Sequence, residues 1–210
     1  MKPQTNSRFE THMTLLLDAN SDSTRAKDWA TAHDFKWTHI VLDSGNTPSQ
    51  PMISFRGQGT LEAQLKRSQS VALQLAQNKF QVARTKIELE LPVAETQIEL
   101  PPNRSFHKQY FEHHFKLLLP RETDFDQLSR FVKRNGGHLS LNARRHRDDG
   151  MQERFVTQRV YKAELSTSYK QFNQLIDVIH TEGIEIVESE HEFVLYDTNF
   201  ELDSGWMERT

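Results

Sequence analysis

One frame of residues occurs twice in this chain, and no other feature constrains its fold as strongly. The frame Phe-Glu-x-His-x-x-Leu-Leu-Leu begins at Phe9 and begins again at Phe111. Each copy has the composition of a β-strand, in which successive side chains point to opposite faces. Two such copies in a chain of 210 residues indicate an internal duplication, with halves that each have the size of a small domain.

The expected order of elements is the same in both halves: strand, helix, strand, strand, helix, strand. This is the ferredoxin-like order, in which two helices cover one face of an antiparallel sheet. The predicted fold class is therefore α+β, with two tandem ferredoxin-like repeats. Their open sheet faces are expected to face each other or to close into a barrel-like cleft.

Proline marks the expected boundary between the repeats. Pro92, Pro101 and Pro102 make residues 92–107 the predicted linker. The first repeat is then residues 1–91 and the second is residues 108–199. Residues 200–210 form a C-terminal tail, and we expect Trp206 to dock it rather than leave it as free coil.

Strand alternation predicts which side chains face the open side of each sheet. In the second copy, Phe111 and Phe115 belong to the helix-covered side. Glu112, His114 and Lys116 belong to the other side, and their counterparts in the first copy are Glu10, His12 and Thr14. Residues 82–91 alternate in the same way, with four charged side chains on one side: Arg84, Lys86, Glu88 and Glu90. A solvated sheet face would show the same alternation, so the pattern alone does not establish a site.

The strand that starts at His138 extends the polar side of the second repeat. The predicted ligand-binding residues are Glu10, His12, Glu112, Lys116, Ser140, Asn142, Arg144 and Arg159. Guanidinium and ammonium groups at a concave face suit an anionic ligand bearing phosphate or carboxylate. His114 and His138 are the acid–base candidates if the chain is a catalyst, because imidazole titrates near neutral pH.

Composition excludes several classes of protein. The net charge of −3 provides no field that would attract nucleic acid. The absence of cysteine excludes disulfides and thiolate chemistry. No apolar run approaches the roughly 20 residues of a membrane span, so we expect a cytoplasmic protein with no membrane partner. No cofactor and no metal ion are predicted, and a homodimer is left open.

Two short matches resemble known enzyme families. The tetrapeptides that begin at His12 and His138 fit the His-x-Thr/Ser pattern of the two-histidine phosphoesterases, whose paired imidazoles act as base and acid. The duplication, however, relates His12 to His114 and not to His138. The run Glu112-x-His114-x-Lys116 resembles the Glu-x-Glu-x-Lys strand of the triphosphate tunnel enzymes, which use metal inside a β-barrel. Histidine replaces the middle acid here, which puts the metal-binding acid pair of that family in doubt.

Three longer segments resemble signatures of a bacterial family whose activity is not established. They are His138-Leu-Ser-Leu-Asn-Ala-Arg144, Glu153-Arg-Phe-Val-Thr-Gln-Arg159 and Leu202-Asp-Ser-Gly-Trp206. This resemblance covers mainly the second half and implies no particular chemistry. The leading hypothesis from the sequence is therefore a binder of a small anionic ligand between the repeats. A phosphohydrolase that uses His114 and His138 is the alternative, and a protein-interaction module without a small-molecule ligand is the third.

Overall fold

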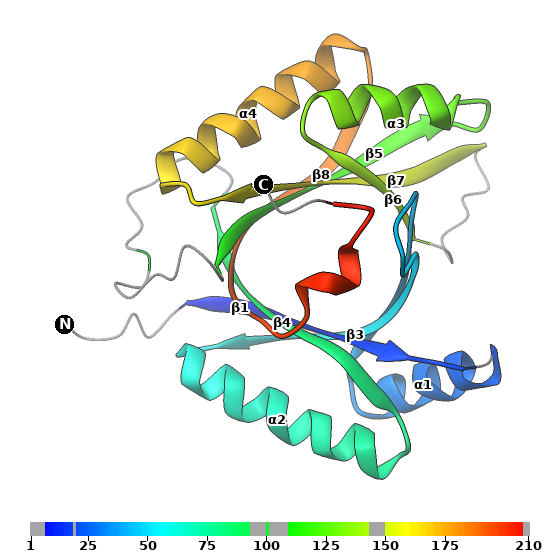
Figure 1. Cartoon of the computed structure of the whole chain (residues 1–210), viewed down its shortest axis with the longest axis vertical. Helices are drawn as coiled ribbons and strands as arrows, with labels where there is room; N and C mark the ends of the chain where they lie inside the picture. Colours follow the sequence, from blue (N-terminus) through cyan, green and yellow to red (C-terminus); the bar gives the residue numbers. More distant parts are fainter. Residues whose placement is uncertain (1–6, 19, 93–99, 101–108, 143–149, 208–210) are drawn as a thin grey trace.

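Eight strands close into one antiparallel barrel, and the four α-helices lie outside it (Figure 1). The computed structural model describes residues 7–18, 20–92, 100, 109–142 and 150–207. The first half consists of β1 (Arg8–Leu16), α1 (Asn20–Ala32), β2 (Lys36–Leu42), β3 (Ser49–Gln58), α2 (Leu61–Gln77) and β4 (Gln81–Leu91). The second half consists of β5 (Tyr110–Pro120), α3 (Phe125–Arg134), β6 (His138–Asn142), β7 (Met151–Tyr161), α4 (Leu165–Thr181) and β8 (Glu185–Asp197), and a 3₁₀ helix, η1 (Phe200–Asp203), follows.

The two halves have the same strand order and join through equivalent edges. Around the barrel the order is β4-β1-β3-β2 in the first half and β8-β5-β7-β6 in the second. β4 pairs with β8 and β2 pairs with β6, both antiparallel, as an approximate twofold relation between the halves requires. Closure leaves neither sheet with an unpaired edge. The predicted α+β class and barrel-like closure are confirmed. The predicted domain boundaries stay a prediction, because most of the 92–107 linker lies outside the described residues.

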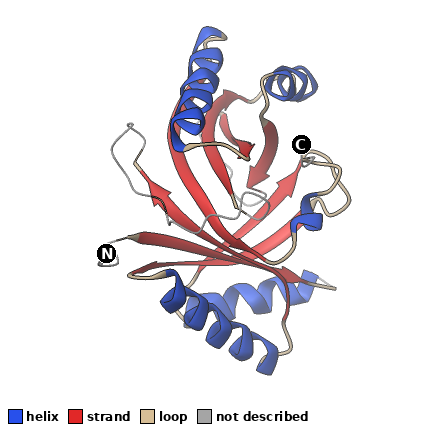
Figure 2. Cartoon of the chain, turned by 60° about the vertical axis from the view of Figure 1, so that its left-hand side comes forward, coloured by secondary structure: helices blue, strands red, loops and turns tan. Residues whose placement is uncertain are grey.

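The helices cover the outer face of the barrel on two opposite sides (Figure 2). Met13 and Leu15 of β1 point outward into one buried cluster with residues of α1 and α2. Phe115 and Leu117 of β5 do the same with residues of α3 and α4. Each fully buried side chain of this size contributes about 1.5–3 kcal/mol relative to exposure. The alternation predicted for β1 and β5 is thus confirmed for these four residues, which belong to the helix-covered core.

Local signals fix the ends of the helices. The Thr60 hydroxyl caps α2 by accepting a hydrogen bond from the Ala63 amide at 3.2 Å, and the Asp124 carboxylate caps α3 through the Gln127 amide at 2.9 Å. Gly136, with φ of +77°, ends α3. A Cβ at the next position, Gly137, would meet the Val156 side chain at 2.7 Å, so this turn has to pass close to β7. In the described part of the chain, no helix is both long and apolar enough to cross a membrane.

Candidate functional site

The barrel interior contains a cavity of about 210 Å³ that is lined by side chains from all eight strands. Because outward positions on the strands are apolar, the inward positions hold most of the polar residues. Seven residues that the sequence assigned to the site lie in this lining: Glu10, His12, Glu112, His114, Lys116, Ser140 and Arg159. The sequence therefore placed these side chains on the correct face of their strands.

Three other predicted site residues are not among the lining residues that the structure describes. His138 lies outside the cavity lining, and its ring packs against Trp206 with a centroid distance of 5.8 Å. The pairing of His114 with His138 as acid and base stays a prediction. The imidazole equivalent to His114 on the inner face is His12. The side chain of Asn142 and the whole of Arg144 lie outside the described residues.

The first half places a connected set of polar groups on β1 and β3. Glu10 lies opposite Arg56 and His12 lies opposite Ser54. The Arg56 Nε donates to Glu10 Oε2 at 2.9 Å, and the His12 Nδ1 lies 2.6 Å from the Ser54 hydroxyl. Strand pairing thus orients the carboxylate and the imidazole with one partner each from the neighbouring strand.

The second half repeats this set at equivalent positions. Glu112 lies opposite Arg159 and His114 lies opposite Thr157. The Arg159 Nε donates to Glu112 Oε2 at 2.5 Å, and the His114 Nδ1 lies 3.0 Å from the Thr157 hydroxyl. The duplication therefore extends beyond the backbone to a carboxylate, an imidazole, a hydroxyl and a guanidinium in each half.

The last strand of each half, β4 or β8, adds one more carboxylate to the set of polar groups in that half. The pKa values of these two carboxylates are shifted in opposite directions. Glu88 of β4 is fully buried, with the Lys86 Nζ at 2.5 Å and the His12 Nε2 at 2.8 Å. Burial alone would raise the pKa of Glu88, but Lys86 and His12 outweigh it and lower the pKa to about 2. In the same way, Arg159 and Lys86 hold the pKa of Glu112 well below its usual range despite burial.

Glu192 of β8 is the counterpart of Glu88, since each lies opposite the first glutamate of its own half. It is 4% exposed, and its one recorded ion-pair partner within the described structure is the His114 Nε2 at 3.5 Å. Burial and the neighbouring carboxylate of Glu88 raise the pKa of Glu192 well above its usual range. The interior therefore holds one buried carboxyl group that no lysine or arginine of the described residues neutralises.

The tail closes one end of the barrel. Asp203 accepts hydrogen bonds from Arg84 Nη1 at 2.8 Å, Arg159 Nη2 at 2.6 Å and Gln50 Nε2 at 2.8 Å. The Trp206 indole donates to the Leu139 carbonyl at 2.9 Å, so the predicted docking of Trp206 is observed. In Figure 1 the red segment that begins with η1 lies across the barrel opening. The anion that Arg159 was predicted to hold is thus, in this state, a carboxylate of the chain itself.

The opposite end of the cavity has no such cover among the described residues. Lys36 lies there with its side chain 68% exposed and its Nζ 4.0 Å from Glu10. Arg56, the counterpart of the buried Arg159, is 64% exposed. Lys116 lies on the wall in an ion pair with Glu188. Among the described residues, this open end is the entrance to the cavity.

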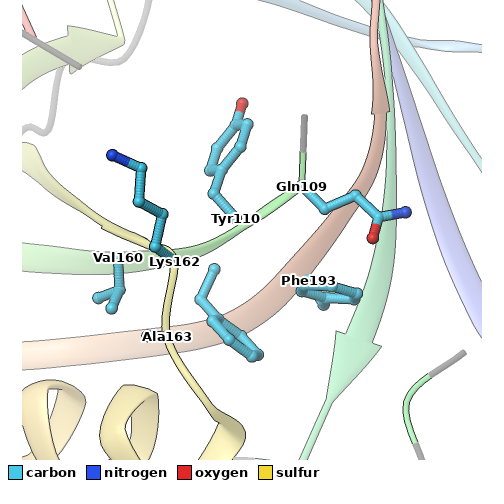
Figure 3. A pocket seen from close by; sticks show the side chains of 7 residues that line it. Gln109, Tyr110, Val160, Lys162, Ala163 and Phe193 are labelled. Atoms are coloured by element: carbon cyan, nitrogen blue, oxygen red, sulfur yellow. The ribbon is translucent and has the colours of Figure 1, made fainter. Parts of the chain in front are cut away.

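Two further features lie outside the barrel. A pocket of about 10 Å³ between the ends of β5 and β7 is lined by Val160 and Phe193 among others (Figure 3). It has room for about one water molecule. A groove of about 550 Å³ lies beside α3 and α4, and Asp177 is the one ionisable side chain among its described lining residues. Neither offers the clustered ionisable groups of the barrel interior.

A buried histidine pair lies between β5, β8 and α4. The Ser168 hydroxyl lies 2.9 Å from the Nε2 atoms of both His113 and His191. Burial lowers the pKa of His113 to about 4 and that of His191 to about 3, so both are neutral at pH 7. These histidines pack in the helix-covered core, against Phe172 of α4.

Comparisons with known proteins do not assign the chain to a family. No family model and no curated protein matches it. Among solved structures, a heme-binding protein from Thermus thermophilus aligns over 91% of this chain and 92% of its own, at 10% identity and a TM-score of 0.29. A mutant of chlorite dismutase from Candidatus Nitrospira defluvii aligns over 94% of this chain and 93% of its own, at 8% identity and a TM-score of 0.31. At these identities and TM-scores, the similarity assigns neither a family nor a function to this chain.

Proposed function

We propose that this protein binds a small polar ligand inside the barrel. The observation that supports the proposal is the cavity of about 210 Å³ inside the barrel, with ionisable groups on its wall. Small barrels are ordinarily filled by their own side chains. Buried charges lower stability relative to well-packed apolar residues, so a structural role alone does not account for this interior.

The volume limits the size of the ligand. A cavity of this volume has room for several water molecules. Typical sites for drug-sized ligands measure about 300–1,000 Å³. The ligand is therefore a small acid, a small phosphate ester or an ion with its hydration shell, and a part of a larger molecule would have to stay in the entrance.

An anionic group on the ligand is the finer part of the proposal. Arg159 and Lys86 already bind buried carboxylates, which leaves them little capacity for another anion. Lys36 and Lys116 are better placed, because they lie at the entrance and their described partners are a distant carboxylate at 4.0 Å and an exposed one. We expect the anionic group near these two ammonium groups.

A cavity-filling variant tests the proposal. Thr38 lines the cavity, and Thr38→Trp would occupy much of its volume without changing any charge. Ser70→Trp, on the exposed side of α2, is the matched control. Thermal shifts should be measured with carboxylates, sugar phosphates, nucleotides and divalent ions. A ligand at about 100 times its dissociation constant stabilises by about 2.7 kcal/mol. The proposal expects a shift that Thr38→Trp abolishes and Ser70→Trp retains; a shift that both variants retain would contradict an interior site.

The hydrolase alternative has a structural basis in the equivalent imidazoles of His12 and His114. Each is held at Nδ1 by a hydroxyl and directs Nε2 toward a carboxylate. This alternative predicts phosphate release that is lost in His12→Ala and His114→Ala but is retained in His138→Ala. An interaction module instead predicts no shift with any compound and a protein partner that Thr38→Trp does not displace.

A further inference from the structure

Three side chains from three adjacent strands converge inside the barrel. Glu88 of β4, His114 of β5 and Glu192 of β8 each offer one ligand atom, and these atoms all lie within 4.8 Å of one another. The strands come from both halves of the duplication, so the group exists only when the barrel is closed. Two carboxylate oxygens and one imidazole nitrogen form a common donor set for a divalent transition metal.

The duplication shows that the two halves differ in charge at one position beside the inner-face histidine. In the first half, Lys86 lies opposite His12 and supplies an ammonium group to the interior. At the equivalent place in the second half, opposite His114, the residue is Glu190. One half thus carries its own positive charge beside the histidine, whereas the other has an additional acid there. This difference places an additional carboxylate beside His114, and its ion-pair partner is Arg56 of the first half at 3.7 Å.

The carboxyl group of Glu192 is the observation that points to a bound cation. It is buried and lines the cavity, and it has no lysine or arginine partner among the described residues. Glu112, its neighbour on β5, is neutralised by Lys86 and Arg159. An isolated buried carboxylate is unfavourable unless it is paired, protonated or bound to a metal ion.

We propose that Glu88, His114 and Glu192 bind one divalent transition-metal ion, of the Zn²⁺ or Co²⁺ type. The nitrogen donor disfavours Ca²⁺ and Mg²⁺, which take oxygen ligands. Glu88 and Glu192 would each coordinate through one oxygen, so that Glu88 keeps an ion pair on the other. Three protein ligands leave at least one position for water or for an anionic group of a ligand. This inference rests on the proposed use of the barrel interior as a binding site.

Direct titration with Co²⁺ tests the inference. Protein treated with EDTA and dialysed would be titrated with CoCl₂, and the visible absorption of bound Co²⁺ would be recorded. The expected result is saturation at one ion per chain, with at least about tenfold weaker binding in His114→Gln and Glu192→Gln. Glu188→Gln is the matched control, because it removes a carboxylate from the same strand whose side chain is 52% exposed. It should bind Co²⁺ as the wild type does.

The outcomes separate this inference from the proposed function. No Co²⁺ binding, or binding that Glu188→Gln weakens as much as Glu192→Gln does, overturns the metal site. If an organic ligand still gives a shift that Thr38→Trp abolishes, the proposed function remains. If Co²⁺ binds as expected and no organic compound gives such a shift, the metal site remains and the wider proposal fails. Circular dichroism of each variant would confirm that the barrel is folded.

Discussion

Asp203 of the tail should stabilise the closed barrel, and Asp203→Asn tests this in isolation. The substitution keeps the shape of the side chain but removes the negative charge that Arg84 and Arg159 share. Asp203 is 1% exposed, so solvent cannot compensate for the loss. Both guanidinium groups keep one other carboxylate, Asp197 for Arg84 and Glu112 for Arg159.

Two lines of reasoning give the size of the effect. Breaking a buried ion pair costs about 3–5 kcal/mol, and the remaining partners favour the lower end, about 3 kcal/mol. The pKa of Asp203 gives a similar figure: burial would raise it, but Arg159 and Arg84 lower it from 3.8 to about 2. Nearly two pKa units correspond to about 2 kcal/mol of stability at neutral pH. Because the folded pKa is the lower one, this contribution is present above pH 4 and is lost as the pH falls toward 2.

Urea denaturation at pH 7 and at pH 3 measures both predictions. The free energy of unfolding of Asp203→Asn should be about 2–3 kcal/mol below that of the wild type at pH 7, and the difference should fall to about half at pH 3. Glu201→Gln, in the same 3₁₀ helix but exposed, is the control and should differ from the wild type by less than about 0.5 kcal/mol. Equal stability of the two variants at pH 7 would refute the account of the tail.

Three further predictions follow from the same interior and core. Glu88→Gln should destabilise the metal-free protein by about 3 kcal/mol in urea denaturation, because it leaves Lys86 with one partner fewer. Glu192→Gln should change that stability by less than about 1 kcal/mol, since burial raises the pKa of Glu192 well above its usual range and so favours the uncharged form that Gln resembles; a loss as large as that of Glu88→Gln would contradict the opposite pKa shifts of the two groups. Phe172→Ala should cost about 3–5 kcal/mol, because this ring is fully buried against β5; a loss below about 1 kcal/mol would contradict the core described for α4.

The sequence predicted the fold through local periodicity. Alternation on either side of His114 separated Phe115 from Glu112 correctly, because a strand has only two faces. The closure of the barrel was left open beside face-to-face packing, since it depends on which edges pair. β2 with β6 and β4 with β8 are long-range pairings that no single segment encodes.

The site was predicted only in part for the same reason. The charged side of β4 was visible in the alternation, but Glu88 and Lys86 were not assigned to the site because their neighbours on β5 and β8 were unknown. His138 was assigned by its place on a strand, and the Trp206 ring that packs against it comes from a distant tail. The role of Asp203 carried no local signal at all. In each case the missing information was a contact between segments far apart in the chain.

The most direct test of the central claim is a crystal structure of the protein grown with Co²⁺, with anomalous scattering measured at the cobalt edge. The account predicts one strong peak inside the barrel, within coordination distance of Glu88, His114 and Glu192, with a further ligand or water on the side of Lys36. Cobalt bound only on the outer surface, with ordered water alone between these three side chains, would contradict it.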